Sequence, residues 1–189
     1  MDHALDVPDL AAAGGFTLRP WRLTDLPLVR EASEDAYIPL ITTVPAPYSE
    51  DEGVAFVERQ WGRASTGTGY PFVIVDPGGR PVGNAGLWLR PEPDRASVGY
   101  WVVESARGRG AALAALRAVA DWARRDLALT RLELHVEPWN TASVRTAERA
   151  GFRRERLIRD GVRTAAGYRD VFLYARPHDG TPGTPGVDL

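Results

Sequence analysis

The sequence predicts one α/β domain built on a mixed, mostly antiparallel and twisted sheet of about seven strands, with helices on both faces. Three observations predict this fold class. Two strands joined by a tight turn occupy residues 70–90, a strand, a helix and a strand follow between residues 96 and 136, and two apolar segments close the chain. Antiparallel hairpins followed by a βαβ unit are typical of such a sheet. The predicted element order is βααβββαβαββ.

The composition indicates a single folded domain. The chain has 189 residues, of which 44% are hydrophobic and 25% are charged, and this is enough apolar material for one core. We expect the domain to cover residues 16–176. The small and polar residues 1–15 before it, and the Pro- and Gly-rich residues 177–189 after it, are expected to form flexible ends.

Residue types that are missing exclude several classes of function. The chain has no Cys, and all 23 of its basic residues are Arg, which excludes disulfides, Schiff-base lysines and Walker-type phosphate loops. A formal net charge of -2 does not favour a nucleic-acid partner. No membrane span and no signal peptide is recognised, so a cytoplasmic protein is expected. The three His are too scattered for a metal triad, and no metal is expected.

The first elements are a strand and two helices. Residues 16–21 alternate as a strand does, and Thr24 is an N-cap candidate before apolar residues at 28, 29 and 32. The segment Ser49-Glu-Asp-Glu52 has the spacing of a capping box. It predicts a second helix that ends near Gly62.

The remaining elements follow from turn residues and apolar periodicity. The turn Asp76-Pro-Gly-Gly79 predicts a hairpin between strands 70–75 and 81–90. A third strand covers 96–103, and an Ala-rich helix over 111–127 presents one apolar face. The last expected elements are strand 132–136, a helix over 141–150 that Gly151 ends, and strands 152–158 and 168–174.

The segment Arg107-Gly-Arg-Gly-Ala-Ala112, between an apolar strand and the Ala-rich helix, is the sharpest feature of the sequence. Gly108 and Gly110 let the backbone approach an anion, and the first N–H groups of the helix lack internal partners. Arg107 and Arg109 add charge-assisted donors. The segment suits a pyrophosphate, although Gly and Arg before a helix also occur in plain strand-to-helix turns. A dinucleotide fingerprint is not favoured, because Leu113 stands where it needs Gly or Ala.

A second cluster follows the strand Leu132-Glu-Leu-His-Val-Glu137. It contains Asn140 and Ser143 and ends with the helix that closes on Gly151-Phe152. With the segment 107–112, this cluster resembles the two cofactor motifs of GNAT acetyltransferases. The final strand, 168–174, is similar to that of bacterial N-terminal acetyltransferases of ribosomal proteins (the RimJ/RimL type).

The resemblance implies a set of site residues. Residues 107–112 (Arg107, Gly108, Arg109, Gly110, Ala111 and Ala112) would hold the pyrophosphate of acetyl-CoA. A bulge within Trp101, Val102 and Val103 would direct a backbone N–H at the thioester carbonyl. Asn140 would bind the amides of the cofactor or cap the helix, and Ser143 would face the sulfur or only start the helix.

The implied reaction is direct transfer of acetyl to an amine, expected to be the α-amine of a protein or peptide N-terminus. His135 is a candidate base, but a lone strand His is more often structural, and Asp160 is a weak candidate. Two other functions stay open, namely acetylation of a small amine such as an antibiotic or polyamine, and noncatalytic acyl-CoA binding. No nucleic acid or membrane is expected as a partner, and a homodimer stays open.

Overall fold

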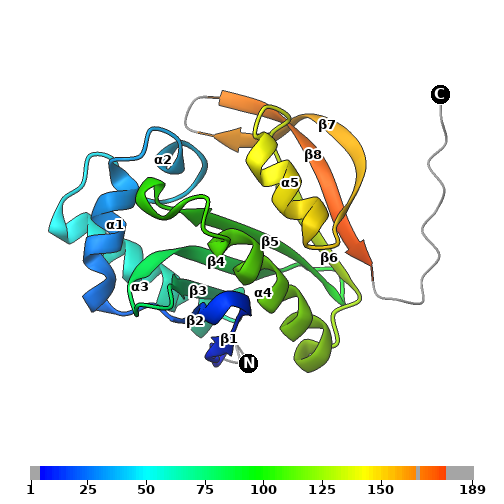
Figure 1. The fold of residues 1–189 in the computed structure, drawn as a ribbon. Helices are drawn as coiled ribbons and strands as arrows, with labels where there is room; N and C mark the ends of the chain where they lie inside the picture. Colours follow the sequence, from blue (N-terminus) through cyan, green and yellow to red (C-terminus); the bar gives the residue numbers. More distant parts are fainter. Residues whose placement is uncertain (1–4, 165–166, 178–189) are drawn as a thin grey trace.

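The computed structural model describes residues 5–164 and 167–177. They form one eight-stranded sheet in the order β1-β2-β3-β4-β5-β6-β8-β7 (Figure 1). Only β5 and β6 pair in parallel, and the other neighbouring strands are antiparallel. The predicted fold class is confirmed, with one strand more than expected.

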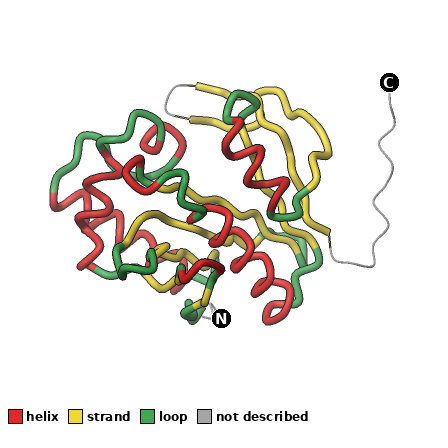
Figure 2. The backbone as a smooth tube through the Cα atoms, in the orientation of Figure 1, coloured by secondary structure: helices red, strands yellow, loops and turns green. Residues whose placement is uncertain are grey.

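Figure 2 distinguishes helices from strands along the chain. The strands of the described residues are β1 (Leu10–Ala11), β2 (Thr17–Pro20), β3 (Gly69–Val75), β4 (Pro81–Leu89), β5 (Arg95–Val102), β6 (Arg131–Val136), β7 (Arg153–Thr164) and β8 (Gly167–Pro177). The α-helices there are α1 (Leu26–Ser33), α2 (Ile38–Ile41), α3 (Glu50–Ser65), α4 (Ala111–Leu127) and α5 (Thr141–Arg149). Short 3-10 turns are η1 (Ala13–Gly15), η2 (Leu23–Asp25) and η3 (Glu104–Ala106). None of these helices is long and apolar enough to cross a membrane.

The additional strand β1 corrects the expectation that residues 1–15 form a flexible end. Leu10 pairs with Leu18 of β2 and is buried, and the N–H of Leu5 donates to the carbonyl of Ala64 at 2.7 Å. Two residues are too short for a periodic pattern, so the sequence carried no strand signal there. Residues 1–4 and 178–189 of the expected flexible ends lie outside the described residues.

The N-cap of α1 differs from the prediction, whereas that of α3 agrees. Thr24 lies inside the turn η2, and Asp25 occupies the N-cap position. The reason is that the Asp25 carboxylate accepts the N–H of Arg22 and the Arg19 guanidinium, at 2.7–2.8 Å, which delays the helix to Leu26. At α3, Ser49 Oγ accepts the N–H of Glu52 at 3.2 Å as predicted, and the helix continues to Ser65.

Helices cover both faces of the sheet, as predicted (Figure 1). On one face, Trp122 of α4 packs edge-on against Tyr70 and Phe72 of β3, with ring centroids 4.8 and 5.6 Å apart. On the other face, Phe56 of α3 packs against Trp21 at 5.2 Å. Apolar residues on both sides therefore make this central part of the sheet the core.

The parallel strands β5 and β6 separate toward their carboxyl ends. They pair only from Arg95↔Arg131 to Ser97↔Glu133. Beyond that point, residues 98–102 of β5 and 134–136 of β6 have no described pairing with each other. The two halves of the sheet diverge there (Figure 1). This divergence leaves backbone groups of β5 available to a ligand.

Candidate active site

The segment 107–112 forms an open loop at the N-terminus of α4. Gly108 and Gly110 have φ angles of 77° and 89°, and Gly110 is the N-cap. A Cβ added at either glycine would meet nothing within 4 Å, so the space beside the loop is free. The bond from Ala114 N–H to Gly110 carbonyl begins the helix, and the N–H groups of Ala111 and Ala112 have no partner within it. Backbone donors and helix dipole favour a pyrophosphate here.

Arg107, a predicted ligand of the pyrophosphate, also contacts protein groups outside the loop. Its Nε donates to the carbonyl of Val102 at 3.0 Å, and its guanidinium pairs with Asp35 Oδ2 at 2.5 Å. Asp35 also accepts the N–H groups of Tyr37 and Ile38 at 2.8 and 3.0 Å. Arg107 therefore joins the loop to the start of α2, and both Arg107, which is 47% exposed, and Arg109 face solvent.

The electrostatics of Asp35 favour this link. Burial opposes ionisation of the carboxyl group, but the N–H groups of Ile38 and Tyr37 and the Arg107 guanidinium outweigh it. Together they lower the pKa of Asp35. The link is therefore an ion pair with two further hydrogen bonds at neutral pH.

The strand pattern indicates that Val102, rather than Trp101 or Val103, directs its backbone N–H toward the divergence of β5 and β6. The N–H of Val103 donates to Val82 at 3.1 Å, and the Trp101 ring is buried against Trp21. Successive residues of a strand direct their N–H groups to opposite sides, so that of Val102 faces the divergence. The pairing of β4 with β5 keeps one register from Ala96 to Val102. The bulge expected within residues 101–103 is therefore not seen in this pairing.

At the start of α5, Asn140 is an N-cap. Its Oδ1 accepts the N–H of Ser143 at 3.1 Å, which agrees with the structural alternative for Asn140. Ser143 is partly exposed in the first turn, beside the buried hydroxyl of Tyr100 on β5. That Tyr100 hydroxyl has no hydrogen-bond partner among the described residues. Burial raises its pKa, and the hydroxyls of Ser143 and Thr146 oppose the rise. The hydroxyls of Tyr100, Ser143 and Thr146 thus lie near one another at the divergence.

His135 lies away from Ser143. Leu134 pairs with Tyr174, whose hydroxyl donates to Glu148 of α5 at 3.2 Å, so α5 covers that face of β6. Because side chains alternate along a strand, His135 points to the other face. Burial, and then the charge of Arg90, lowers its pKa. The structure does not bring the two predicted catalytic residues together.

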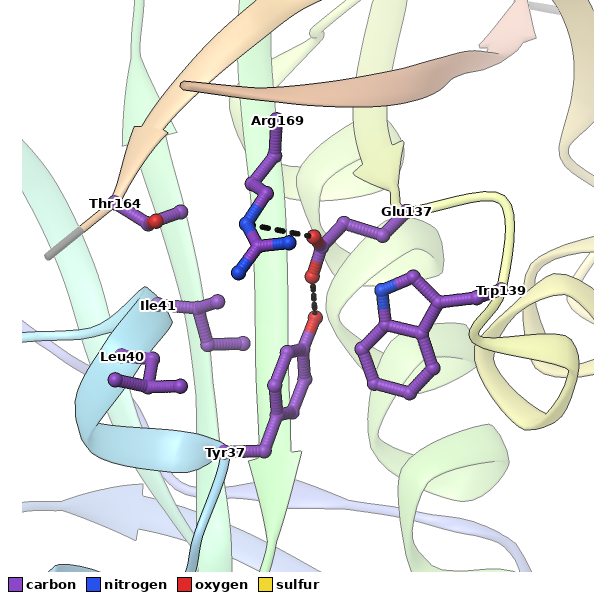
Figure 3. Close-up of a pocket in the computed structure, with 7 residues that line it drawn as sticks. All are labelled: Tyr37, Leu40, Ile41, Glu137, Trp139, Thr164 and Arg169. Atoms are coloured by element: carbon purple, nitrogen blue, oxygen red, sulfur yellow. Dashed lines mark hydrogen bonds and ion pairs between the residues drawn. The ribbon is translucent and has the colours of Figure 1, made fainter. Parts of the chain in front are cut away.

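A pocket of about 180 Å³ lies where β6 ends (Figure 3). It is lined by Tyr37, Leu40, Ile41, Glu137, Trp139, Thr164 and Arg169. Glu137 is 8% exposed and accepts the hydroxyl of Tyr37 in a short hydrogen bond. The Nε of Arg169 is 3.9 Å from its other oxygen. Burial, reinforced by Glu137, raises the pKa of Tyr37, so the phenol remains a donor.

A short turn joins the pocket residue Glu137 to the start of α5. The N–H of Asn140 donates to the carbonyl of Glu137 at 3.0 Å, and the side chain of Asn140 interacts with the Tyr37 hydroxyl. Glu137 and Ser143 therefore flank the same short turn. Glu137 thus lies beside the divergence of β5 and β6.

Sequence reasoning missed Glu137, Tyr37 and Arg169. Glu137 had a signal, because it is an acidic residue directly after an apolar strand and before Pro138. Tyr37 is 100 residues away in sequence and had none. Asp160, the weak base candidate, lies on the exposed, irregular part of β7 with a φ of 50°. No group of three His, Asp or Glu among the described residues could hold a metal ion.

Comparisons with known proteins agree with this architecture. The model of the acetyltransferase (GNAT) domain matches residues 16–153. The probable N-acetyltransferase YjcK of Bacillus subtilis (strain 168) is 33% identical over 104 residues, which are 53% of this chain and 58% of YjcK. The chain thus covers little more than half the length of that curated relative.

Two solved structures share the fold. Mycobacterium smegmatis RimJ, in complex with CoA-disulfide, has a TM-score of 0.78 at 27% identity, covering 94% of this chain and 90% of RimJ. RimL, a ribosomal L7/L12 alpha-N-protein acetyltransferase in complex with coenzyme A, has a TM-score of 0.79 at 22% identity, covering 92% and 100%. The resemblance inferred from the two sequence motifs is confirmed, and this chain belongs to the GNAT acetyltransferase family.

Proposed function

We propose that this protein transfers the acetyl group of acetyl-CoA directly to the α-amine of a protein or peptide N-terminus. The observation that carries the proposal is the position of Glu137, a buried carboxylate at the point where β5 and β6 diverge. Glu137 lines the pocket of about 180 Å³. The open loop of residues 107–112 is joined to another wall of this pocket, because Arg107 pairs with Asp35, two residues before Tyr37.

The loop is suited to the pyrophosphate of acetyl-CoA. The free space beside Gly108 and Gly110 admits an anion, and the N–H groups of Ala111 and Ala112 and the Arg109 guanidinium are its donors. The unpaired edge of β5 suits the pantetheine amides. The thioester, when bound along this edge, supplies the electrophilic carbonyl.

The reaction uses groups on both sides of the divergence. Glu137 takes one proton from the acceptor ammonium, and the neutral nitrogen attacks the thioester carbonyl. The N–H of Val102 stabilises the oxyanion. Collapse forms the C–N bond and breaks the C–S bond, and Ser143 donates a hydrogen bond to the leaving thiolate. The thiolate takes the second proton released by the nitrogen.

An α-amine fits this site better than a Lys side chain. A carboxylate is a weak base, and an α-ammonium with a pKa of about 7.7 to 8.0 loses its proton more readily than a Lys at about 10.4. The difference of about 2.5 pH units corresponds to about 3.5 kcal/mol.

Two other functions are less well supported. A polyamine or aminoglycoside carries several positive charges, and Arg169 at the pocket would repel the second of them. A noncatalytic acyl-CoA-binding domain would have no use for a buried carboxylate beside the divergence, since burying an ion is costly.

The test is an acceptor screen with labelled acetyl-CoA. Each peptide carries either a free N-terminus without Lys, or a blocked N-terminus and an internal Lys, and polyamines and aminoglycosides are assayed beside them. We expect the free N-terminus to be acetylated fastest. Faster labelling of the blocked peptide or of a small amine would refute the N-terminal assignment, and labelling of none would favour the noncatalytic function.

A further inference from the structure

We infer that the pocket selects the first two residues of the acceptor, an apolar residue at position one and an acidic residue at position two. The inference rests on the proposed function, in which Glu137 binds the α-amine. The inference concerns the pocket side chains that do not contact the amine in the proposed function.

The first selection comes from apolar side chains at the pocket. Leu40 and Ile41 of α2 are 38% and 37% exposed, and Trp139 is 60% exposed. The volume of about 180 Å³ equals about six water molecules at about 30 Å³ each, which is room for one side chain of modest size. An apolar side chain placed there removes the faces of Leu40, Ile41 and Trp139 from water.

The second selection comes from Arg169. Its side chain is 45% exposed, and its one ionic contact among the described residues is the 3.9 Å approach to Glu137, which is too long for a hydrogen bond. In Figure 3 its guanidinium lies in the pocket, with one terminal nitrogen on the side of Ile41 and the other on the side of Glu137. They are free to bind a carboxylate with both donors, a geometry for which guanidinium is suited.

The side chains proposed to select position one and the side chain proposed to select position two lie on different elements. Arg169 comes from β8, whereas Leu40 and Ile41 come from α2 (Figure 3). In an extended peptide, successive side chains point to opposite sides. A peptide whose amine lies on Glu137 can therefore direct its first side chain toward α2 and its second toward Arg169.

The same groups disfavour basic residues at both positions. A cationic side chain at position one would lose water among apolar groups, and one at position two would meet the Arg169 charge. Neutral Asn at position two keeps the size of Asp and loses only the charge. The pair Asp and Asn therefore isolates the role of Arg169.

The test compares peptides that differ only at these two positions and contain no Lys. Position two is Asp, Asn or Arg after a constant Val, and position one is Val or Arg before a constant Asp. We expect kcat/KM to be about fivefold higher for Asp than for Asn, in the range of a half-exposed ion pair. The preference should shrink as salt is raised. Arg in place of Val at position one should lower kcat/KM at least about tenfold.

Two variants of the same hairpin assign the charge effect. In Arg169→Met the preference for Asp over Asn should disappear. In the control Arg159→Met, which removes a cation that is 82% exposed on β7, it should persist.

The outcomes separate this inference from the proposed function. Equal rates with Asp and Asn, a preference retained in Arg169→Met, or no loss with Arg at position one would overturn the inference while leaving N-terminal acetylation intact. Acetylation of no peptide, with a polyamine or aminoglycoside acetylated instead, would overturn both.

Discussion

Single residues at the divergence of β5 and β6 divide the chemistry between them. Glu137 is buried under the hydroxyl of Tyr37, and Ser143 is half-exposed beside Tyr100. A turn of four residues, 137–140, connects Glu137 to Asn140, which caps the helix of Ser143. The proposed base, Glu137, and the proposed leaving-group donor, Ser143, can therefore be tested separately.

Ser143→Ala should lower kcat by about tenfold to a hundredfold while barely changing acetyl-CoA affinity. The thiolate that Ser143 binds exists only as the C–S bond breaks, so the interaction is made in the transition state. Single-turnover rates and calorimetric titration measure the two quantities. Thr141→Ala, in the same turn, is the control for the helix start, and an unchanged single-turnover rate in Ser143→Ala would assign Ser143 to helix structure alone.

Glu137→Gln should lower kcat/KM for an N-terminal peptide by about a hundredfold near pH 7, because the amide cannot accept the proton. The deficit should narrow above about pH 8, where the α-amine is already neutral. A pH profile of both enzymes checks this. A deficit that stays constant from pH 6 to 9 would mean that Glu137 only binds the acceptor.

At the scale of elements, the loop before α4 and the segment before α2 are physically joined. Asp35 accepts the first N–H groups of α2 and pairs with Arg107, which in turn holds the carbonyl of Val102. The loop of residues 107–112, the end of β5 and the segment before α2 therefore share one hydrogen-bonded connection.

Asp35→Asn should destabilise the protein most at neutral pH. The pKa of Asp35 is lowered in the folded state, so its stabilisation is present above the unfolded pKa of about 3.9 and is lost as pH falls through the folded value. The difference in Tm between wild type and variant should therefore shrink below about pH 4. The neighbouring Glu34→Gln is the control, and a Tm difference that does not depend on pH would argue against the ion pair.

Gly110→Ala should abolish acetyl-CoA binding, whereas Gly79→Ala should not. Both glycines have positive φ angles, 89° and 84°, and an added Cβ would meet nothing within 4 Å at either. Both variants therefore carry a similar backbone strain, of about 1 kcal/mol. Only Gly110 belongs to the loop of residues 107–112, where an added Cβ would occupy the open space in which the pyrophosphate is proposed to bind. Equal loss of binding in the two variants would trace the effect to stability instead.

For the whole molecule, the divided sheet places the proposed cofactor and acceptor sites at one opening. Pairing of β5 with β6 at only one end holds the two halves together, and α4 and α5 lie across the face on the cofactor side (Figure 1). Ligand binding at the opening should therefore stabilise the domain as a unit.

Acetyl-CoA should raise the thermal stability, by about 2.7 kcal/mol at about 100 times its dissociation constant. NAD should leave Tm unchanged, because the loop lacks the third small residue of a dinucleotide site. Melting curves with each ligand test this. A shift with NAD and none with CoA would contradict the cofactor assignment.

Local sequence determined most of the framework of this protein. Several features depend on residues close together in the chain, namely the hairpin turn at Asp76, the cap at Ser49, the helix 111–127 and the glycine loop. The hydrogen bonds and backbone angles that form them are local and do not depend on which distant elements become neighbours. The motifs at 107–112 and 140–152 also indicated the family, because their spacing reflects a loop and a helix start.

Only the tertiary structure decided how the side chains of the site are used. Arg107 met Asp35 across 72 residues, Glu137 met Tyr37 across 100, and His135 fell on the face opposite α5. The sequence shows that a residue can carry charge or donate a proton, but its partner depends on which strands and helices become neighbours. Long-range packing therefore gave Arg107, a predicted phosphate ligand, a partner in Asp35, and placed Glu137 where it is the base of the proposed reaction.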